Sequence, residues 1–148
     1  MTAYVTVREA RAHAKARHLD MSGLDDVTFS ALLLRASELL DGCCVFQGTK
    51  QAPTQIRAWP RRNAYDENGY ELTIVPPLIK AVSIELAVLL FQDETDALRA
   101  LGMIGTIQTE RVGDVHISYD RQSRSMPVLL RRLWSLLAAS QPVYVRRG

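Results

Sequence analysis

The sequence predicts a mainly α-helical protein: a small bundle of about four helices with an inserted β-hairpin or extended arm and an extended C-terminal tail. Apolar residues recur at helical spacing in three long segments, a helix-capping motif stands near the N-terminus, and the apolar period switches to two in one later segment. The 148 residues, 47% hydrophobic and 23% charged, fit one domain. We expect a single domain over residues 1–148, with a helical core at about 6–102 and 127–140, the arm at 104–119 and the tail at 141–148.

The first two helices are predicted from their caps and their apolar faces. Thr6-Val7-Arg8-Glu9 has the spacing of a capping box, which predicts a helix from about Val7 to His18. Asp25 is the expected N-cap of the second helix, and Gly42 its C-terminal stop. The apolar face of that second helix consists of Phe29, Leu32, Leu33, Ala36, Leu39 and Leu40.

Between Val45 and Thr73 no periodicity is present, and glycines, prolines and asparagines interrupt the chain. A loop of this length inside a small domain is usually functional or held by its own side chains. We expect Trp59, Tyr65 and Tyr70 to be the anchors that hold it against the helices.

A third helix is predicted to begin at Pro76-Pro77 and to run to about Phe91, apolar over more than one face and therefore central. Asp93 to Asp96 should break or cap it, and a short helix from Ala97 to Leu101 should end at Gly102.

The C-terminal part combines the period-two arm, a last helix and a short tail. Ile107, Val112, Val115, Ile117 and Tyr119 mark the strand-like pattern of the arm. Pro127 opens the last helix, expected to reach about Ser140, with one apolar stripe that includes Leu130 and Leu133 and a second formed by Leu129 and Leu136. Two apolar stripes on one helix allow two interpretations. Either one stripe packs against the core and the other binds a partner, or the helix is fully buried.

The net charge, its distribution and the cysteine content limit which ligands and which cysteine chemistry are expected. The net charge of +2 does not mark the whole surface as a binder of nucleic acid or membrane, and no segment is long and apolar enough to span a bilayer. Residues 1–110 carry 11 basic and 14 acidic side chains, whereas residues 111–148 carry 7 and 2, so a basic face is expected in the C-terminal quarter. Cys43 and Cys44 are expected to be reduced packing residues.

The sequence contains no arrangement of residues typical of catalysis or of metal binding. His13 and His18 lie five residues apart, on different sides of a helix, and His116 alternates with apolar neighbours in the arm. The acidic residues from Asp93 to Asp96 lack the spacing of a calcium loop. We therefore expect a protein that is not an enzyme and that needs no cofactor.

One cluster combines an aromatic ring with positive charge, as single-strand-binding surfaces do. Trp59 is followed by Pro60 and lies close in sequence to Arg57, Arg61 and Arg62. The simpler interpretation is that Trp59 pins the long loop onto the helices.

Five segments in this order resemble one family: Tyr4 to Ala10, Arg35 to Gly42, Ala58 to Arg61 with Gly69-Tyr70, Val75 to Ala87, and Glu110 to Tyr119. Together they resemble the small head-to-tail adaptor (connector) proteins of tailed bacteriophages and prophages, whose members are often labelled DnaT-like single-stranded-DNA-binding proteins. The resemblance covers about residues 4 to 120.

This resemblance implies a structural protein of the virion neck, present in the host cytoplasm during assembly. It would form a ring of twelve copies beneath the portal protein and dock the next neck or tail-completion protein. The ring would extend the channel through which genomic double-stranded DNA passes, without sequence-specific contacts. No membrane would be involved. The alternative is a phage or prophage accessory of replication that coats single-stranded DNA.

Within this picture we assign four groups of residues. The ring interface is expected at Val112, Val115, Ile117, Tyr119, Leu129 and Leu136, and the portal-docking tail at Val143, Tyr144, Val145, Arg146 and Arg147. The side chains that face the channel or the DNA are expected to be Arg124, Arg131 and Arg132. The loop anchor is expected to consist of Trp59, Pro60 and Arg61.

Overall fold

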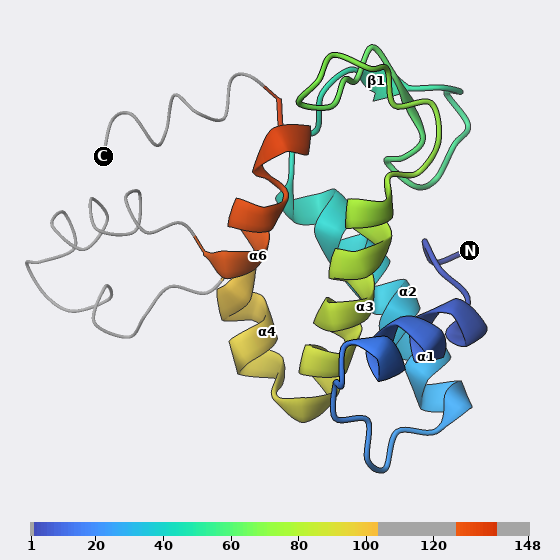
Figure 1. The fold of residues 1–148 in the computed structure, drawn as a ribbon, viewed down its shortest axis with the longest axis vertical. Coiled ribbons are helices and arrows are strands. Elements are labelled where there is room, and N and C mark those ends of the chain that lie inside the picture. The colour runs from blue at the N-terminus through green and yellow to red at the C-terminus, as the bar shows by residue number, and fades with distance from the viewer. Residues whose placement is uncertain (1, 104–126, 139–148) are drawn as a thin grey trace, which may run out of the picture.

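The computed structural model describes residues 2–103 and 127–138, and these form a mainly helical body with one small two-stranded sheet (Figure 1). The prediction of a mainly α fold is confirmed. The helices are α1 (Val7–Ala16), α2 (Asp26–Cys43), α3 (Pro77–Gln92), α4 (Glu94–Ala100), α6 (Val128–Arg132) and the short 3₁₀ helix η3 (Trp134–Leu136). The predicted arm at 104–119 and the tail at 141–148 lie outside the described residues.

The α3 helix is the centre of the body, as its apolar sequence predicts. It packs against α1 and α2 on one side and against α4 and α6 on the other (Figure 1). Pro76 is its N-cap and Pro77 its first residue, where a missing N–H costs no hydrogen bond. Its buried residues are Ile79, Val82, Ser83, Ile84, Leu86, Ala87, Val88 and Leu90.

The predicted caps of the first two helices are confirmed. The Glu9 amide donates to Thr6 Oγ1 at 3.1 Å, and the Thr6 amide donates to Glu9 Oε1 at 3.0 Å. The Asp25 carboxylate accepts a hydrogen bond of 2.8 Å from the Thr28 amide at the start of α2. Each helix therefore begins where its own side chains satisfy its first free N–H groups.

The predicted ends of the two helices are each off by one or two residues. The α1 helix ends at Ala16 rather than at His18, because His18 adopts a φ of 56°, which an α-helix cannot include. Gly42 lies inside the last turn of α2 and does not stop it; the helix ends after Cys43, where Cys44 becomes extended.

Residues 45–75, which we call the lobe, form a set of loops at one end of the body (Figure 1). The lobe contains the antiparallel pair β1 (Thr49–Lys50) and β2 (Arg61–Arg62), with Thr49 opposite Arg62. A second, isolated bridge pairs Tyr65 with Glu71. Neither the two-residue strands nor the single bridge is long enough to produce a period-two pattern in the sequence.

The short α4 helix begins at Glu94, earlier than the predicted start at Ala97. Asp93 caps it by accepting a hydrogen bond of 3.2 Å from the Asp96 amide. Gly102 follows the helix with a φ of +77°, and a Cβ at this glycine would lie 3.0 Å from Cγ of Pro127. Gly102, which follows α4, and Pro127, which directly precedes α6, therefore lie side by side.

The predicted last helix from Pro127 to Ser140 is wrong in length. It divides into α6 and η3, and Leu137 then becomes extended and pairs with Phe46 of the lobe. The Gln47 amide donates to the Leu136 carbonyl at 3.0 Å, and the Ala138 amide donates to the Val45 carbonyl at 2.8 Å. These long-range backbone hydrogen bonds replace the last turns of a continuous helix.

Replacing Gly48 with alanine should destabilise the lobe severely. Gly48 has a φ of +71°, and a Cβ there would lie 1.9 Å from the Arg62 carbonyl oxygen, so β1 and β2 would have to separate. We expect a loss of at least about 2 kcal/mol in the free energy of unfolding, measured by urea denaturation.

The matched control for this substitution is Gly69→Ala. Gly69 has a similar φ of +88° but no atom within 4 Å of the added Cβ, so only the backbone strain of about 1–2 kcal/mol is expected. Equal losses for the two variants would contradict the close approach at Gly48.

Candidate functional site

Trp59 lies at the centre of the cluster in which the sequence combines an aromatic ring with positive charge, and the structure places it in the core. Its side chain is 1% exposed, and its ring packs edge-on against Phe46 with the centroids 5.5 Å apart. This burial is consistent with Trp59 as the anchor of the long loop, which stays a prediction. A ring enclosed in this way has no free face on which a base could stack.

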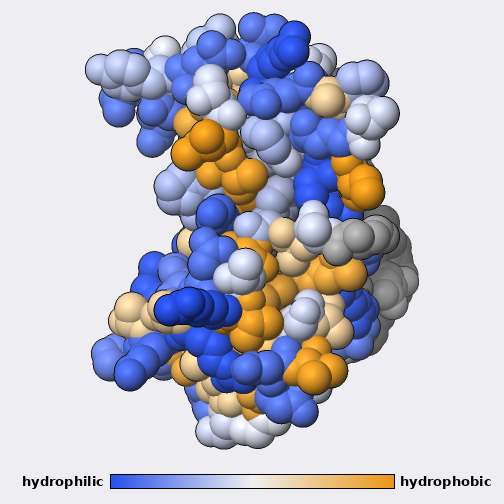
Figure 2. Space-filling view, turned by 90° about the vertical axis from the view of Figure 1, so that its right-hand side faces the viewer, coloured by the Kyte–Doolittle hydropathy of each residue, from blue (hydrophilic) through white to orange (hydrophobic). Residues whose placement is uncertain are grey.

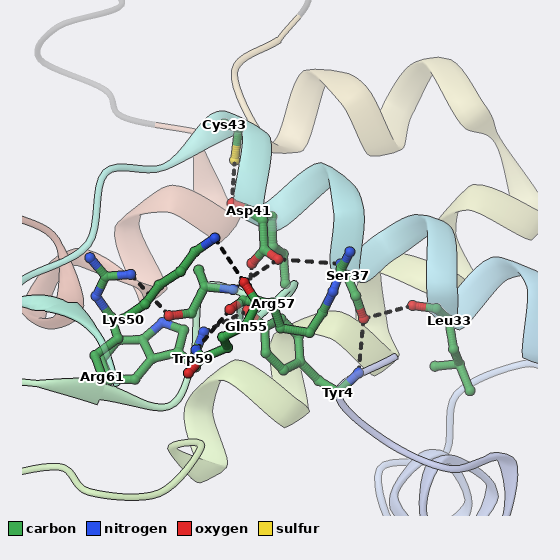
Figure 3. Close-up of polar contacts among 12 residues, drawn as sticks. Tyr4, Leu33, Ser37, Asp41, Cys43, Lys50, Gln55, Arg57, Trp59 and Arg61 are labelled. Carbon is green, nitrogen blue, oxygen red and sulfur yellow. Dashed lines mark hydrogen bonds and ion pairs between the residues drawn. The ribbon is translucent and has the colours of Figure 1, made fainter. Parts of the chain in front are cut away.

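A buried polar network lies beside Trp59 and joins three parts of the chain (Figure 3). The Tyr4 hydroxyl donates to Asp41 Oδ1 at 2.5 Å and accepts a hydrogen bond of 3.3 Å from the Trp59 amide. The Ala58 amide donates to Asp41 Oδ2 at 3.1 Å. The network therefore holds the N-terminal segment and the lobe against the last turns of α2.

Asp41 also pairs with Arg57, whose Nη1 lies 3.3 Å from Asp41 Oδ2. The Arg57 side chain is only 12% exposed, and its Nε and Nη1 make no hydrogen bond within the described residues. An enclosed guanidinium that faces a carboxylate inside the protein is not available to a phosphate from solvent.

The Arg61 guanidinium is also occupied by contacts within the protein. Its guanidinium donates to the carbonyl oxygens of Gln47 at 2.6 Å, Ala58 at 2.9 Å and Gly48 at 2.9 Å, and its Cζ lies 6.0 Å from the centre of the Trp59 ring. Three carbonyl acceptors match the fork of the guanidinium and fix the path of the lobe. Of the four clustered residues Arg57, Trp59, Arg61 and Arg62, only Arg62 is exposed.

The other two predicted anchors are wrong. Tyr65 is 43% exposed and Tyr70 is 71% exposed, so neither ring pins the lobe to the helices. Tyr70 instead lies in a tight turn in which Asp66 Oδ1 accepts hydrogen bonds from the amides of Asn68 and Tyr70. These exposed tyrosines stand beside acidic side chains, Asp66, Glu67 and Glu71, which disfavour an approaching phosphate.

Leu129 and Leu136, assigned from the sequence to a ring interface, are 6% and 4% exposed and pack into the body of their own chain. The apolar side chains that α6 and η3 do present to solvent are Val128, 52% exposed, and Trp134, 37% exposed. The remaining predicted interface and tail residues, and Arg124, lie outside the described residues.

Of the two predicted channel-facing arginines in the described chain, Arg132 is engaged within the fold. It donates to the carboxylate of Glu85 on α3. Glu85 also lies 3.5 Å from His13 Nε2 and 3.7 Å from Arg17 Nη2, both from the α1 end of the body. This cluster ties α1 and α6 to the central helix, and no sequence motif marks it because its members are far apart along the chain.

Apolar side chains also reach the surface elsewhere. Figure 2 shows orange patches at the narrow waist between the lobe and the helical body. The exposed apolar residues outside α6 and η3 include Val27, Val45, Ile56, Ile74 and Met103.

The described part of the chain contains no group of three metal-ligating side chains and no helix able to cross a membrane. Its charges also balance, with thirteen basic and thirteen acidic residues. The described part therefore has no net charge with which to attract a polyanion from a distance.

Residues 1–146 match the family model described as "Putative DnaT-like ssDNA binding protein". The chain belongs to this DnaT-like family. No curated protein and no solved structure matches the chain significantly. The match includes the Trp59 cluster and all but the last two residues of the basic C-terminal quarter.

In this DnaT-like protein, Trp59→Ala should lower the free energy of unfolding by about 3 kcal/mol or more, because it leaves a large cavity beneath the lobe. Urea denaturation followed by circular dichroism measures the loss. Tyr70→Ala is the control: its ring is 71% exposed, so a change within about 0.5 kcal/mol is expected. A mild effect of Trp59→Ala would contradict the anchoring role.

A second prediction concerns alkaline pH. Burial and the hydrogen bond to Asp41 raise the pKa of Tyr4 well above its usual value of 10.0. The unfolded chain therefore releases this proton above about pH 10 while the folded chain keeps it, so stability falls as the pH rises. This one group contributes a slope of up to about 1.4 kcal/mol per pH unit.

Tyr4→Phe should remove that part of the slope. Urea denaturation of the wild type and of the variant at several pH values above and below 10 provides the comparison. Parallel pH profiles of the two proteins would show that Tyr4 titrates normally in the folded state.

Proposed function

We propose that the protein binds single-stranded DNA weakly and without reading its sequence, through basic side chains of its C-terminal quarter. The observation that carries the proposal is the match of residues 1–146 to a family described as binding single-stranded DNA. Residues 111–148 support it with seven basic and two acidic side chains. Under this proposal the protein is not an enzyme and needs no cofactor.

The described body supports an electrostatic rather than a stacking mode of binding. Trp59 is enclosed, Arg57 faces Asp41, and Arg61 is held by three carbonyl oxygens. Binding that depends on phosphate contacts alone weakens steeply with salt and differs little between base compositions.

The test is fluorescence anisotropy with a labelled oligothymidine at several salt concentrations. Combining Arg146→Ala with Arg147→Ala should weaken binding and lower the slope of log K against log salt by about 1.4, if both side chains contact phosphates. The control combines Arg8→Ala with Lys15→Ala, two exposed basic residues of α1, and removes the same charge from the body. The proposal fails if no binding occurs at low salt, or if the two double variants lose affinity equally.

A second candidate function is the head-to-tail connector, which the enclosed Trp59 cluster favours because that cluster serves the fold rather than DNA. The exposed apolar residues favour it as well. Val27, 81% exposed, lies on α2, whereas Val128 and Trp134 lie on α6 and η3 across α3 (Figure 1). A closed ring needs two different patches on each subunit, one for each neighbour. Such a ring would sit in the virion neck, bind portal and tail-completion proteins, and surround double-stranded DNA.

Light scattering and negative-stain imaging, with and without the portal protein, test this candidate. Rings of the wild type, alone or on the portal, are expected. Val27→Asp and Val128→Asp should each give monomers, and an equimolar mixture of the two should give dimers that cannot close, because one intact patch remains on each subunit. Salt-sensitive binding to oligothymidine without portal association would leave the first proposal standing instead.

A further inference from the structure

Two adjacent thiols lie at the junction between α2 and the lobe, and neither proposed function uses them. Cys43 is the last residue of α2 and Cys44 is its C-cap, with a φ of −125° and a ψ of 144°. Their sulfur atoms lie 3.1 Å apart, and both cysteines are free. Figure 3 shows Cys43 at the end of α2, two residues beyond Asp41.

The two thiols differ in access and in acidity. Cys43 is half-buried, whereas Cys44 is 8% exposed. The hydrogen bond between the two thiols lowers the pKa of Cys43, and the same bond together with burial raises the pKa of Cys44. Asp41 opposes the first effect, because its negative charge disfavours a thiolate nearby. Cys43 is therefore the thiol that meets a reagent first, with Cys44 in position to react second.

We propose that Cys43 and Cys44 form a reversible thiol-modification site that is oxidised by small disulfides of the glutathione class. The Cys43 thiolate attacks one sulfur of the small disulfide, forms a mixed disulfide and expels one small thiol. The Cys44 sulfur then attacks Cys43 Sγ, its proton passes to the departing sulfur, and the second small thiol leaves. The protein loses two electrons and two protons, and the small disulfide gains both.

The local backbone permits the second step. The sulfur atoms already lie within 3.1 Å, so ring closure needs a short approach and no movement of a helix. The peptide between the two cysteines stands where the helical hydrogen bonds of α2 end. A ring of adjacent cysteines is strained, and strained disulfides are easily reduced, so the modification is reversible under mild conditions.

We expect oxidation to affect the residues that directly follow Cys44. Residues 45–47 form the backbone hydrogen bonds that hold residues 136–138 to the lobe. A twist of the Cys43–Cys44 peptide should move Val45, the first residue of this hydrogen-bonded segment. The amides of Gln47 and Ala138 should therefore exchange with solvent faster in the oxidised protein than in the reduced one.

The experiment treats the purified full-length chain with oxidised glutathione and follows its intact mass. We expect a monomer lighter by two hydrogen atoms, without free thiols, and restored by dithiothreitol. Cys44→Ser should stop at one glutathione on Cys43, and Cys43→Ser should react at least about tenfold more slowly than Cys44→Ser, because Cys44 is buried.

A stable mixed disulfide in the wild type, a disulfide-linked dimer, or equal reaction rates for the two single variants would overturn the proposal. Peptide mapping of the oxidised wild type provides a readout that does not depend on the folding of any variant. It should yield one peptide that contains Cys43 linked to Cys44. DNA binding is measured separately, so the thiol site and the proposed functions stand or fail independently.

Discussion

One carboxylate, that of Asp41, joins the irregular parts of the chain to the helical body. It lies near the end of α2 and accepts hydrogen bonds from the Tyr4 hydroxyl and the Ala58 amide, while its charge balances Arg57. The lobe has only two paired residues in each strand, so it gains little from its own secondary structure. Its position depends on this buried network and on Trp59, because loss of one hydrogen-bonding group would leave its buried partner unpaired.

Features that depend on residues three or four apart were predictable from the sequence, and those that depend on distant residues were not. The caps at Thr6 and Asp25 and the central, apolar α3 belong to the first kind. The end of the last helix belongs to the second, because Leu137 pairs with Phe46 of the lobe and not with its own helix. For the candidate site, the sequence predicted Trp59 as an anchor, but the carbonyl partners of Arg61 become visible only once the lobe is folded.

Charge that is counted from a sequence overstates the charge that a surface offers to DNA. Arg57, Arg61 and Arg132 would each be counted as possible phosphate contacts, yet each is directed at a carboxylate or at carbonyl oxygens of the same chain. Under the proposed DNA-binding function, phosphate contacts would fall to other basic groups, and counterion release rather than shape would govern the affinity.

The close approach of Gly102 to Pro127 gives the chain a closed insertion point. A Cβ at Gly102 would lie 3.0 Å from Cγ of Pro127, so the body fixes both ends of the intervening segment at one place. The free energy needed to join two fixed points grows only slowly with the number of residues between them. A change in the number of residues between Gly102 and Pro127 should therefore cost the helical core little stability, since the two junction points stay where they are.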